Sequence, residues 1–383
     1  MARWTIDLLA SAPADDTTSG LSRVVWELGA ATASLGHRVR VLYPADPPTP
    51  APPFRGVEAV PIPVADASRR PFGRDRRFGE RATALIGPST DLVVGNDEKA
   101  GALGRLKGPP GRPVFAMFVH DVALHTFDTL RPLEPDRGIR QRVGNFLDRR
   151  ALQRLESAAL RRAKIIFVGS GLNAQLLERH YGVAGPRVHM LPLGVPGPRD
   201  VGTRLEARQA LHIPPDVPVV AFVGRTPERQ GLPTALAAFA RVRAFFPGAR
   251  FVVVGSSPAA APGVLSLGTV DEDTKARVLR AADVFLFPTR YEGFGLAPRE
   301  AMAYGLPTVV SRHVPLDGIA DAEAVRVVGS DDPGEYASEL AELLADPALR
   351  RTMGEAARSA ARSFSFERMA DRFEQAVAPL LGG

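Results

Sequence analysis

Cysteine is absent from all 383 residues. Without a thiol the chain can form no disulfide, thiolate zinc site or iron–sulfur cluster, and it has no cysteine nucleophile. We therefore expect a cytoplasmic protein, since a reducing compartment is the default for such a chain. Long apolar runs are also missing. No stretch approaches the ~20 residues that a membrane-spanning helix needs, and the first ten residues are too interrupted for a signal peptide.

Lysine is almost as scarce as cysteine. The chain has only four lysines, so 44 of its 48 basic residues are arginine. With 35 prolines, this bias resembles a GC-rich codon habit. The planar guanidinium nevertheless suits phosphate, and a formal net charge of +6 favours an anionic ligand. Net charge does not distinguish a nucleotide from a nucleic acid or a lipid headgroup.

Short β-branched runs alternate with segments of helical period. This alternation predicts an α/β protein with parallel sheets covered on both faces, and the length predicts two domains at ~150 residues each. The strands are expected at Thr5–Leu9, Arg38–Tyr43, Asp91–Val94, Pro113–Val119, Lys164–Val168, Val217–Val223, Arg250–Val254, Asp283–Phe287 and Thr308–Ser311. The helical segments include Leu21–Leu35, Leu232–Phe246, Asp346–Ser363 and Phe364–Leu381.

A proline- and glycine-rich stretch, Leu191–Pro198, is the expected linker between the two halves. It divides the chain into a first domain at residues 1–195 and a second at residues 196–362, followed by a last helix at 363–383.

A glycine turn follows the predicted strand at Asp283–Phe287. Gly293 and Gly295 would let the backbone turn sharply beside a ligand, and a helix beginning near Leu296 would point its free N–H groups at a phosphate. Glu292 and Glu300 would accept hydrogen bonds from sugar or ribose hydroxyls. Composition alone leaves open an ordinary glycine-rich loop with two surface glutamates.

Several further segments occur in a fixed order. The loop Gly224–Gly231 follows a predicted strand, His120 and Asp121 follow another, and Val168–Ser170 ends a third at a serine that would cap the next helix. Other segments of the same series are Ser19–Leu28, Val254–Gly255, Leu267–Val270 and Ala281–Thr289.

Together, these segments resemble the retaining glycosyltransferases of family four. The spacing of Glu292 and Glu300 is similar to the family's E-x7-E motif, and Gly224–Gly231 is similar to its G-R-x4-K-G loop for the donor phosphate. The matches cover almost the whole chain. The resemblance implies the GT-B fold, in which two doubly wound Rossmann-like domains face each other across a cleft. The first domain would bind the acceptor and the second the donor, and the last helix would cross back to the first domain.

The activity that the resemblance implies is the transfer of a sugar, with retention at the anomeric carbon. The donor would be a nucleotide diphosphate sugar, UDP- or GDP-linked, and the acceptor a hydroxyl of a small polar, lipid-linked or natural-product molecule. No cofactor or metal is implied. We expect a front-face reaction in which the leaving phosphate takes the acceptor proton, because no carboxylate is an obvious covalent nucleophile.

The resemblance also assigns candidate residues. The catalytic candidates are His120, Arg225 and Glu292. The donor-binding candidates are Gly20, Gly224, Arg225, Arg229, Gln230, Thr269, Val270, Glu292, Phe294, Gly295, Leu296 and Glu300. The acceptor-binding candidates are Asp97, Glu98, His120, Asp121 and His125, an acidic set that would suit an amino-bearing acceptor.

One departure from the family pattern concerns the donor phosphate. Gln230 stands where the family usually has lysine, and Arg229 or Arg23 could supply the missing positive charge. The departure predicts weaker donor binding or an unusual donor. It also leaves an alternative function, that of a degenerate family member that binds a nucleotide or sugar without turnover.

Two other segments have competing interpretations. Asp271-Glu272-Asp273 matches a metal-binding Asp-x-Asp motif, but capping of the next helix explains it better. The basic run Arg69–Phe78 is compatible with nucleic-acid binding, with weak peripheral membrane contact through Arg69–Arg77, or with a solvated loop near the acceptor. We expect small-molecule partners and no nucleic acid.

Overall fold

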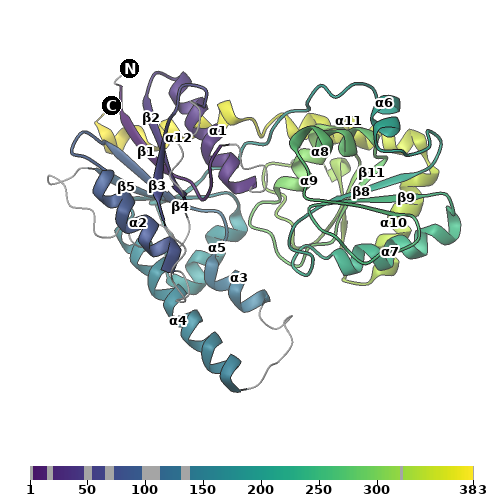
Figure 1. Ribbon diagram of the computed structural model, residues 1–383, viewed down its shortest axis with the longest axis horizontal. Coiled ribbons are helices and arrows are strands. Elements are labelled where there is room, and N and C mark those ends of the chain that lie inside the picture. The colour runs from purple at the N-terminus through teal and green to yellow at the C-terminus, as the bar shows by residue number, and fades with distance from the viewer. Residues whose placement is uncertain are drawn as a thin grey trace. The chain divides into compact units, whose positions relative to one another are not determined.

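The computed structural model describes residues 3–14, 20–46, 54–64, 73–96, 113–130, 139–319 and 322–382. The chain divides into two compact units, which are treated separately below. Unit 1 comprises Met1–Gly194 and Phe366–Gly383, and unit 2 comprises Val195–Ser365. In each unit, helices lie against a central sheet (Figure 1). None of the helices described is long and apolar enough to cross a membrane.

Unit 1 is built on a seven-stranded sheet in the order β3-β2-β1-β4-β5-β6-β7, with every neighbouring pair parallel. Its strands are β1 (Thr5–Leu9), β2 (Arg38–Ala45), β3 (Glu58–Pro63), β4 (Leu92–Asn96), β5 (Val114–Val119), β6 (Ile165–Val168) and β7 (Val188–Met190). Its helices are α1 (Gly20–Ser34), α2 (Gly73–Leu85), α3 (Ala123–Leu130), α4 (Ile139–Arg162), α5 (Gly171–Tyr181) and α12 (Phe366–Leu381).

Unit 2 is built on a six-stranded parallel sheet in the order β10-β9-β8-β11-β12-β13. Its strands are β8 (Val219–Val223), β9 (Arg250–Val254), β10 (Val264–Gly268), β11 (Val284–Phe287), β12 (Thr308–Ser311) and β13 (Val325–Val328). Its helices are α6 (Arg204–Ala210), α7 (Leu232–Phe245), α8 (Glu272–Ala281), α9 (Leu296–Ala303), α10 (Pro333–Ala345) and α11 (Pro347–Ala361), with a short 3₁₀ turn at Ala322–Ala324.

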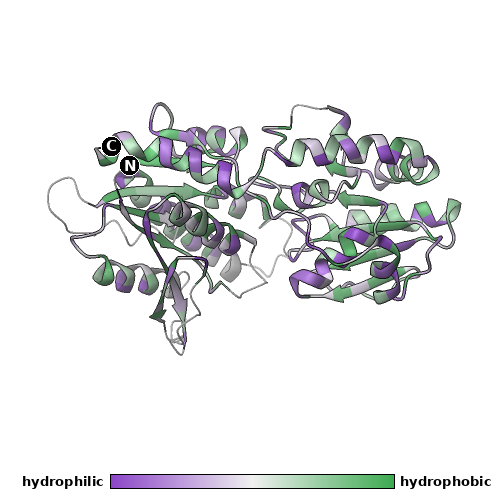
Figure 2. Ribbon diagram, turned by 90° about the horizontal axis from the view of Figure 1, so that it is seen from above, coloured by the Kyte–Doolittle hydropathy of each residue, from purple (hydrophilic) through white to green (hydrophobic). Residues whose placement is uncertain are grey.

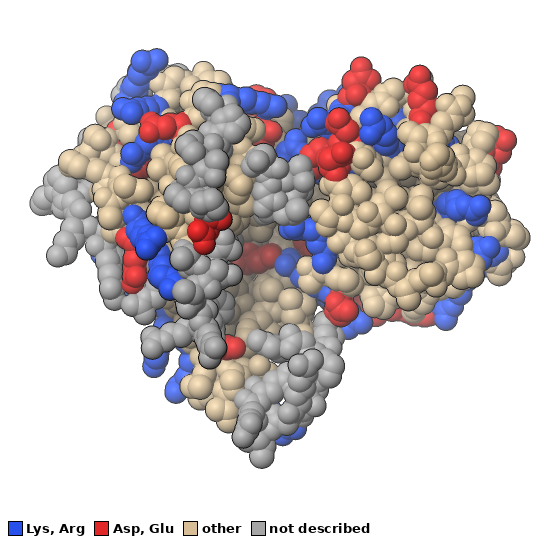
Figure 3. Space-filling view, in the orientation of Figure 1, with Lys and Arg blue, Asp and Glu red and all other residues tan. Residues whose placement is uncertain are grey.

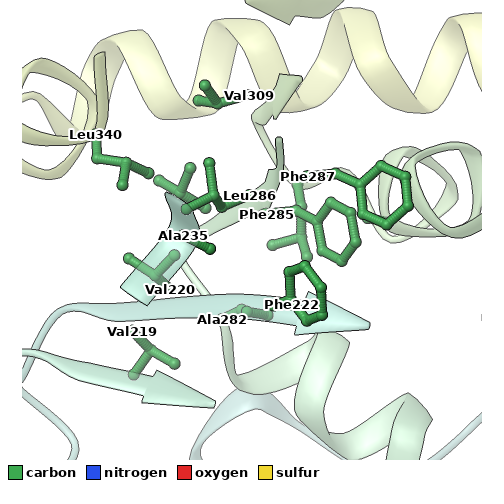
Figure 4. Packing of buried hydrophobic residues seen from close by; sticks show 14 of the residues in the cluster. Val219, Val220, Phe222, Ala235, Ala282, Phe285, Leu286, Phe287, Val309 and Leu340 are labelled. Atoms are coloured by element: carbon green, nitrogen blue, oxygen red, sulfur yellow. The ribbon is translucent and has the colours of Figure 1, made fainter. Parts of the chain in front are cut away.

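The central strands are apolar on both faces because helices cover both faces of a parallel sheet. Figure 2 shows these strands as predominantly hydrophobic in both units. In unit 2 the core contains Phe222, Phe285 and Phe287, whose rings lie together in Figure 4. The ring centroids of Phe222 and Phe287 are 6.0 Å apart, and those of Phe285 and Phe287 are 6.1 Å apart.

All nine predicted strands are present, but four further strands were not expected: β3, β7, β10 and β13. These four are the edge strands of the two sheets. Their residues are mostly half-buried or exposed, and β3 contains two prolines. An edge strand has one neighbour and a partly solvated surface, so its sequence lacks the uniform apolar run that marks a central strand.

The last helix, α12, packs in unit 1 although it follows unit 2 in the sequence. Glu374 on α12 lies 3.0 Å from Nε2 of the buried His37, whose ring stacks on Trp4. Phe373 contacts Phe167 of β6 at a centroid distance of 5.3 Å. Both ends of the chain therefore contribute to the core of unit 1.

Candidate functional site

The sheet of each unit reverses its strand order at one point. In unit 2 the order changes direction between β8 and β11, and in unit 1 between β1 and β4. At such a switch point, the loops leaving two neighbouring strands run to opposite faces and leave a crevice at the carboxyl ends of the strands. Gly224, Arg225, Arg229, Glu292 and Gly295 follow β8 and β11 in unit 2, and His120 follows β5 beside the switch point of unit 1.

In unit 2, the loop after β8 lies against the loop after β9. The Gly224 N–H donates to the Val254 carbonyl at 2.9 Å. Gly255 adopts φ 87°, and a Cβ there would lie 2.7 Å from the Gly224 oxygen and 2.8 Å from Cγ of Arg225. Only glycine allows this close approach. Arg225 itself is exposed, and it forms no hydrogen bond or ion pair with any described residue.

The structure gives Gln230 a definite role in the shape of this loop. Its side-chain oxygen accepts from the Thr226 N–H at 2.9 Å, and its own N–H donates to the Thr226 carbonyl at 2.8 Å. A Cβ on Gly224 would lie 2.5 Å from the same amide oxygen. The neutral side chain is therefore directed back into its own loop, where it closes the turn that carries Arg225.

Arg229, the preceding residue, carries the positive charge. Its guanidinium lies 3.6 Å from an oxygen of Glu292, donates to the Tyr291 carbonyl at 3.2 Å and lies over the Tyr291 ring. The Arg229 carbonyl accepts from the N–H of Arg290 and from the hydroxyl of Thr289. The loop after β8 and the loop after β11 are thus joined, and Arg229 and Glu292 are brought together.

Helix α9 begins at Leu296, as predicted. Its N-cap is Gly295, which adopts φ 82°, and no side chain caps the helix. Gly293 does not adopt a positive φ, so the sharp turn is made at Gly295 alone. Phe294 is buried beneath the turn. Helix α7 also begins at an uncapped glycine, Gly231 with φ 73°.

The other helices of unit 2 differ from α7 and α9. Side chains cap α6, α8, α10 and α11 through Thr203, Asp271, Asp332 and Asp346. A side-chain cap satisfies backbone N–H groups that would otherwise be available to an anion. The two uncapped helices follow β8 and β11, the strands at the switch point. In α7 the Leu232 N–H donates to the Pro227 carbonyl and Pro233 has no N–H, so α9 rather than α7 presents its N-terminus to an anion.

Arg299, a residue that sequence reasoning missed, holds the glycine turn from below. It is 1% exposed, and its guanidinium donates to the carbonyls of Phe294, Gly295, Pro315 and Asp317. Burial lowers the pKa of Arg299 to about 9, although the nearby carboxylates of Asp317 and Glu292 oppose the shift. The only sequence signal is an arginine in the apolar face of a short helix.

Glu300 is paired with a second residue that was missed, Lys275 on α8. The Lys275 ammonium lies 2.8 Å from Glu300 and 3.0 Å from Glu272, and all three side chains are less than one fifth exposed. Burial acts to lower the pKa of Lys275, but the two carboxylates outweigh it and the pKa is raised. The pair therefore keeps Glu300 next to a fixed positive charge.

The remaining donor candidates lie between β10 and α8. Thr269 is exposed and Val270 half-buried, next to Gly268, whose carbonyl accepts from Gly255 at 2.6 Å. Asp271 accepts from the Thr274 N–H at 2.6 Å and caps α8, as expected. Within the described ranges, no group of three or more His, Asp or Glu side chains could hold a metal ion.

In unit 1, a buried network joins the ends of the strands at the switch point. The Asn96 amide, at the end of β4, donates to the Leu9 carbonyl at the end of β1. Its oxygen lies 2.8 Å from Nε2 of His120, which is 4% exposed and stacks on Phe118. The Asn173 amide donates to the His120 carbonyl at 2.7 Å. The Asn96 amide and the Phe118 ring therefore hold the imidazole, and Asn173 holds its backbone.

The segment after His120 is held by a buried carboxylate that was also missed. Glu156 of α4 accepts from the N–H groups of Ala123 and Leu124 at the start of α3. Asp121, just before this helix, is half-buried. On α3, burial lowers the pKa of His125, and the nearby His180 and Arg179 add to the shift.

Other unit 1 candidates are only partly described. Gly20 is the first residue of α1, as the glycine-loop interpretation requires. Ser170 caps α5 by accepting from the Asn173 N–H, as predicted. Asp97 and Glu98 lie outside the described residues, as do residues 69–72 and the side chains of residues 73–76 in the basic run.

Two family models match the chain. Residues 18–196 match the model described as Glycosyltransferase Family 4, and residues 217–346 match the model described as Glycosyl transferases group 1. Together the two matches cover most of both units.

Curated relatives have names from the same class. A D-inositol 3-phosphate glycosyltransferase from Segniliparus rotundus is 33% identical over 240 residues, 57% of this chain and 54% of that protein. The chain thus spans about half the length of this relative. A phosphatidyl-myo-inositol mannosyltransferase from Mycolicibacterium smegmatis is 28% identical over 359 residues, 88% of this chain and 83% of that protein.

Solved structures share the architecture. A sucrose-phosphate synthase from Thermosynechococcus elongatus superposes with a TM-score of 0.80 at 23% identity, over 99% of this chain and 100% of that one. WaaG, a glycosyltransferase involved in lipopolysaccharide biosynthesis, superposes with a TM-score of 0.73 at 20% identity, over 99% and 100% of the two chains. The predicted GT-B fold is confirmed.

Proposed function

We propose that this chain, which belongs to the glycosyltransferases of family four, transfers a sugar from a nucleotide diphosphate sugar to a hydroxyl group, with retention at the anomeric carbon. Unit 2 would bind the donor and unit 1 the acceptor. The proposal is carried by one observation in unit 2. The uncapped N-terminus of α9 and two arginines, Arg225 and Arg229, gather at the switch point beside carboxylates that are themselves paired with cations.

The diphosphate would bind between Arg225 and the N-terminus of α9. Arg225 is exposed on a loop whose shape is fixed by Gly255 and Gln230, so its fork is available to phosphate oxygens. The N–H groups of Gly295 and Leu296 add the positive end of the helix dipole. Gly20, at the start of α1 in unit 1, would be the close-approach glycine on the diphosphate.

Arg229 would replace the lysine that the family usually has one position later. Arg229 belongs to the same loop as Arg225. Its guanidinium is held near the glycine turn by Glu292 and Tyr291 of the loop after β11. This placement favours a working donor site over a degenerate one. It also frees position 230 for a neutral side chain that shapes the loop.

The carboxylates would accept hydrogen bonds from hydroxyl groups of the donor. Glu292 would lie near the donor sugar and Glu300 near the ribose. Lys275 would orient Glu300. Thr269 and Val270 would contact the base, and a UDP- or GDP-linked sugar is the proposed donor.

His120 would position the acceptor hydroxyl rather than act as an obligatory base. The imidazole is held by Asn96 and stacked on Phe118, a rigid arrangement suited to orientation. Asp97, Glu98, Asp121 and His125 remain proposed acceptor contacts. The names of the relatives suggest D-inositol 3-phosphate and phosphatidylinositol as the first acceptors to test.

In the proposed step, the bond between the anomeric carbon and the diphosphate oxygen breaks as the acceptor oxygen bonds to the same face of that carbon. The acceptor proton passes to the leaving phosphate oxygen. Negative charge grows on the diphosphate, so fixed donors and guanidinium groups directed at it lower the barrier most. Arg225, Arg229 and the α9 N-terminus would supply this stabilisation without a metal ion.

A thermal-shift screen with UDP, GDP, ADP and dTDP tests the donor site. One nucleotide is expected to raise the melting temperature of the native protein and not that of Arg225→Ala, because binding to the folded state stabilises it. Arg351→Ala, an exposed arginine on α11, is the matched control and should respond like the native protein. No shift with any nucleotide would contradict a nucleotide-sugar donor.

The same nucleotide, linked to hexoses that include mannose, is then tested for transfer. The anomeric configuration of the product, read by NMR coupling constants, tests retention. Nucleotide binding without transfer to any acceptor would favour the alternative of a binding protein.

A further inference from the structure

Among the described residues two arginines are buried, and only one of them is paired with a carboxylate. Arg208 lies 2.9 Å from the buried Asp283. Arg299 is 1% exposed and forms no ion pair with any described residue, although Asp317 and Glu292 lie near enough to act on its charge. The burial of a cation without a paired counter-charge is costly, so the position of Arg299 indicates a function beyond packing.

The other Lys and Arg side chains of unit 2 are exposed or half-buried. On the face of unit 2 that Figure 3 shows, they are interspersed with acidic side chains around an uncharged centre. Charges at such a surface are solvated and screened, and they contribute little to one fixed site. Arg299 differs from all of them because its charge lies inside the protein, directly below the glycine turn that begins α9.

The guanidinium of Arg299 joins two loops of unit 2. One nitrogen, Nη2, donates to the carbonyls of Pro315 and Asp317 in the loop after β12, at 2.9 and 3.2 Å. The other nitrogen, Nη1, donates to the carbonyls of Phe294 and Gly295 in the turn before α9. Half of the planar fork is thus anchored in one loop, while the other half is directed at the glycine turn.

Two phenyl rings hold the plane of this guanidinium. Its central carbon lies 3.9 Å from the centroid of the Phe294 ring and 4.8 Å from the centroid of the Phe364 ring. Both phenylalanines are buried, and their rings meet edge to face at 79°. The rings favour the cation by their quadrupole and leave the fork little freedom to rotate. The donors of Arg299 therefore have one fixed orientation.

This orientation decides where the turn presents its own N–H group. In a planar trans peptide, the carbonyl and the N–H point in opposite directions. Arg299 holds the Phe294 carbonyl toward the protein interior, so the Gly295 N–H of the same peptide points the other way. Gly295 is buried, and its N–H donates to no described residue. A buried N–H without an acceptor is rare in folded proteins, and an anionic ligand would supply the acceptor.

We propose that Arg299 is a positioning residue for the diphosphate, an inference that rests on the proposed function. It acts through the turn, because its fork holds the Phe294 carbonyl inward and so directs the Gly295 N–H at a phosphate oxygen. Its buried charge adds to the positive potential at the N-terminus of α9, and the bound anion provides the counter-charge that Arg299 lacks. Arg225 and Arg229 would contact the phosphate, whereas Arg299 would not touch it.

Titration calorimetry with inorganic pyrophosphate tests this role without any assumption about the base or the sugar. Arg299→Leu fills the space between the phenyl rings but removes both the fork and the charge, so it should weaken pyrophosphate binding about tenfold or more. Arg299→Lys keeps the charge and loses the fork, so it should recover only part of the affinity.

Two controls separate positioning from stability. Leu340→Ala on α10 removes part of the unit 2 core shown in Figure 4 and lowers stability without removing a bond to the turn. It should bind pyrophosphate like the native protein at a temperature where far-UV circular dichroism shows every variant to be folded. The nucleoside of the nucleotide that binds is the second control. It has no phosphate, so its Kd should be the same for the native protein and both Arg299 variants, whereas the Kd of the nucleoside diphosphate should rise.

Four results would overturn the inference. They are the absence of pyrophosphate binding to the native protein, native affinity in Arg299→Leu, native affinity in Arg299→Lys, and an equal loss of affinity in Leu340→Ala.

These results are distinct from a failure of the proposed function. If the native protein bound pyrophosphate through Arg299 and bound no nucleotide, the nucleotide donor would be wrong and the role of Arg299 would stand. If a nucleoside diphosphate bound the native protein and both Arg299 variants equally, the donor would stand and the role of Arg299 would be wrong.

Discussion

The two units share a topology and differ in the chemistry at their switch points. In unit 2 the carboxyl ends of β8 and β11 carry charged groups and the uncapped N-terminus of α9. Arg229 pairs with Glu292, Lys275 pairs with Glu300, and Arg225 is exposed. In unit 1 the edge between β1 and β4 carries neutral, buried groups that bond one another, namely Asn96, His120 and Asn173.

The difference follows from what each edge has to hold. A charged edge that keeps Arg225 exposed suits a mobile anionic ligand, because the charge remains available until the ligand arrives. A buried edge in which the Asn96 amide holds Nε2 of His120 suits the orientation of one imidazole. The same strand order therefore supports the binding of an anionic ligand in unit 2 and the positioning of the His120 imidazole in unit 1.

The largest expected effect concerns Arg299, which supports the glycine turn at the charged end of the unit 2 sheet. Arg299→Ala removes a buried guanidinium that bonds four carbonyl groups, so we expect it to lower the free energy of unfolding by about 3 kcal/mol or more. Urea unfolding followed by circular dichroism measures the change. Arg351→Ala should stay within about 0.5 kcal/mol of the native protein.

Tryptophan fluorescence sharpens this test, because Trp4 and Trp26, the two tryptophans of the chain, both belong to unit 1. If Arg299→Ala lowers the stability of unit 2 alone, the unfolding transition followed by circular dichroism should shift more than the transition followed by fluorescence. An unchanged free energy of unfolding would show that the turn at Gly295 does not need the Arg299 side chain for its stability.

The neutral edge is tested at His120. If this imidazole orients the acceptor, His120→Ala should lower kcat about a hundredfold, since a misplaced reacting group loses that much. The Kd for the nucleotide should not change, because His120 belongs to the other edge. A variant that lost nucleotide affinity and kept kcat would reverse the assignment of the two units.

Arg225→Ala is the counterpart on the charged edge. Loss of one charge-assisted grip on the diphosphate should weaken nucleotide binding about tenfold, measured by calorimetry. The free energy of unfolding should be unchanged, because the side chain is exposed and makes no hydrogen bond or ion pair within the described ranges. Equal affinity of the variant and the native protein would remove Arg225 from the donor site.

A smaller effect is expected at Lys275. Lys275→Met leaves Glu300 without its cation, so the native preference for a ribonucleotide over its 2′-deoxy form should fall about fivefold. UDP and GDP are compared with their deoxy forms by calorimetry. Lys275→Arg should restore part of the preference, whereas a purely structural lysine would change stability and leave the ratio intact.

The smallest effect is a pH dependence in unit 1. Burial lowers the pKa of both His125 and His180. Between the folded and unfolded pKa values, the unfolded chain binds more protons, so stability falls as the pH drops below about 6.5. Fluorescence-monitored urea midpoints should decrease from pH 7 to pH 5. His125→Asn with His180→Asn should flatten this slope, and a slope that stays the same would assign the acid sensitivity to other groups.

The sequence by itself determined the central strands and the chemistry-bearing residues. The nine central strands are encoded locally, because burial favours short runs of apolar and β-branched residues, which Arg38 and Arg40 interrupt in β2 and Asp7 in β1. The turn at Gly295, the start of α9 and the caps at Ser170 and Asp271 are likewise local properties of residue type and spacing. Arg225 and His120 are candidates through the resemblance to the family, whose motifs are also short stretches of local sequence.

Only the tertiary structure decided which residues support these candidates. The edge strands β3, β7, β10 and β13 form because a neighbouring strand offers hydrogen bonds, and the return of α12 to unit 1 depends on partners such as His37 that are distant in sequence. Three side-chain contacts of the site have no signal in the neighbouring sequence. They are the hydrogen bonds from Arg299 to backbone carbonyls, the ion pair of Lys275 with Glu300, and the bond from the Thr226 N–H to the Gln230 side chain. Local sequence encodes burial and turns, but the partner of a charge is set by the fold.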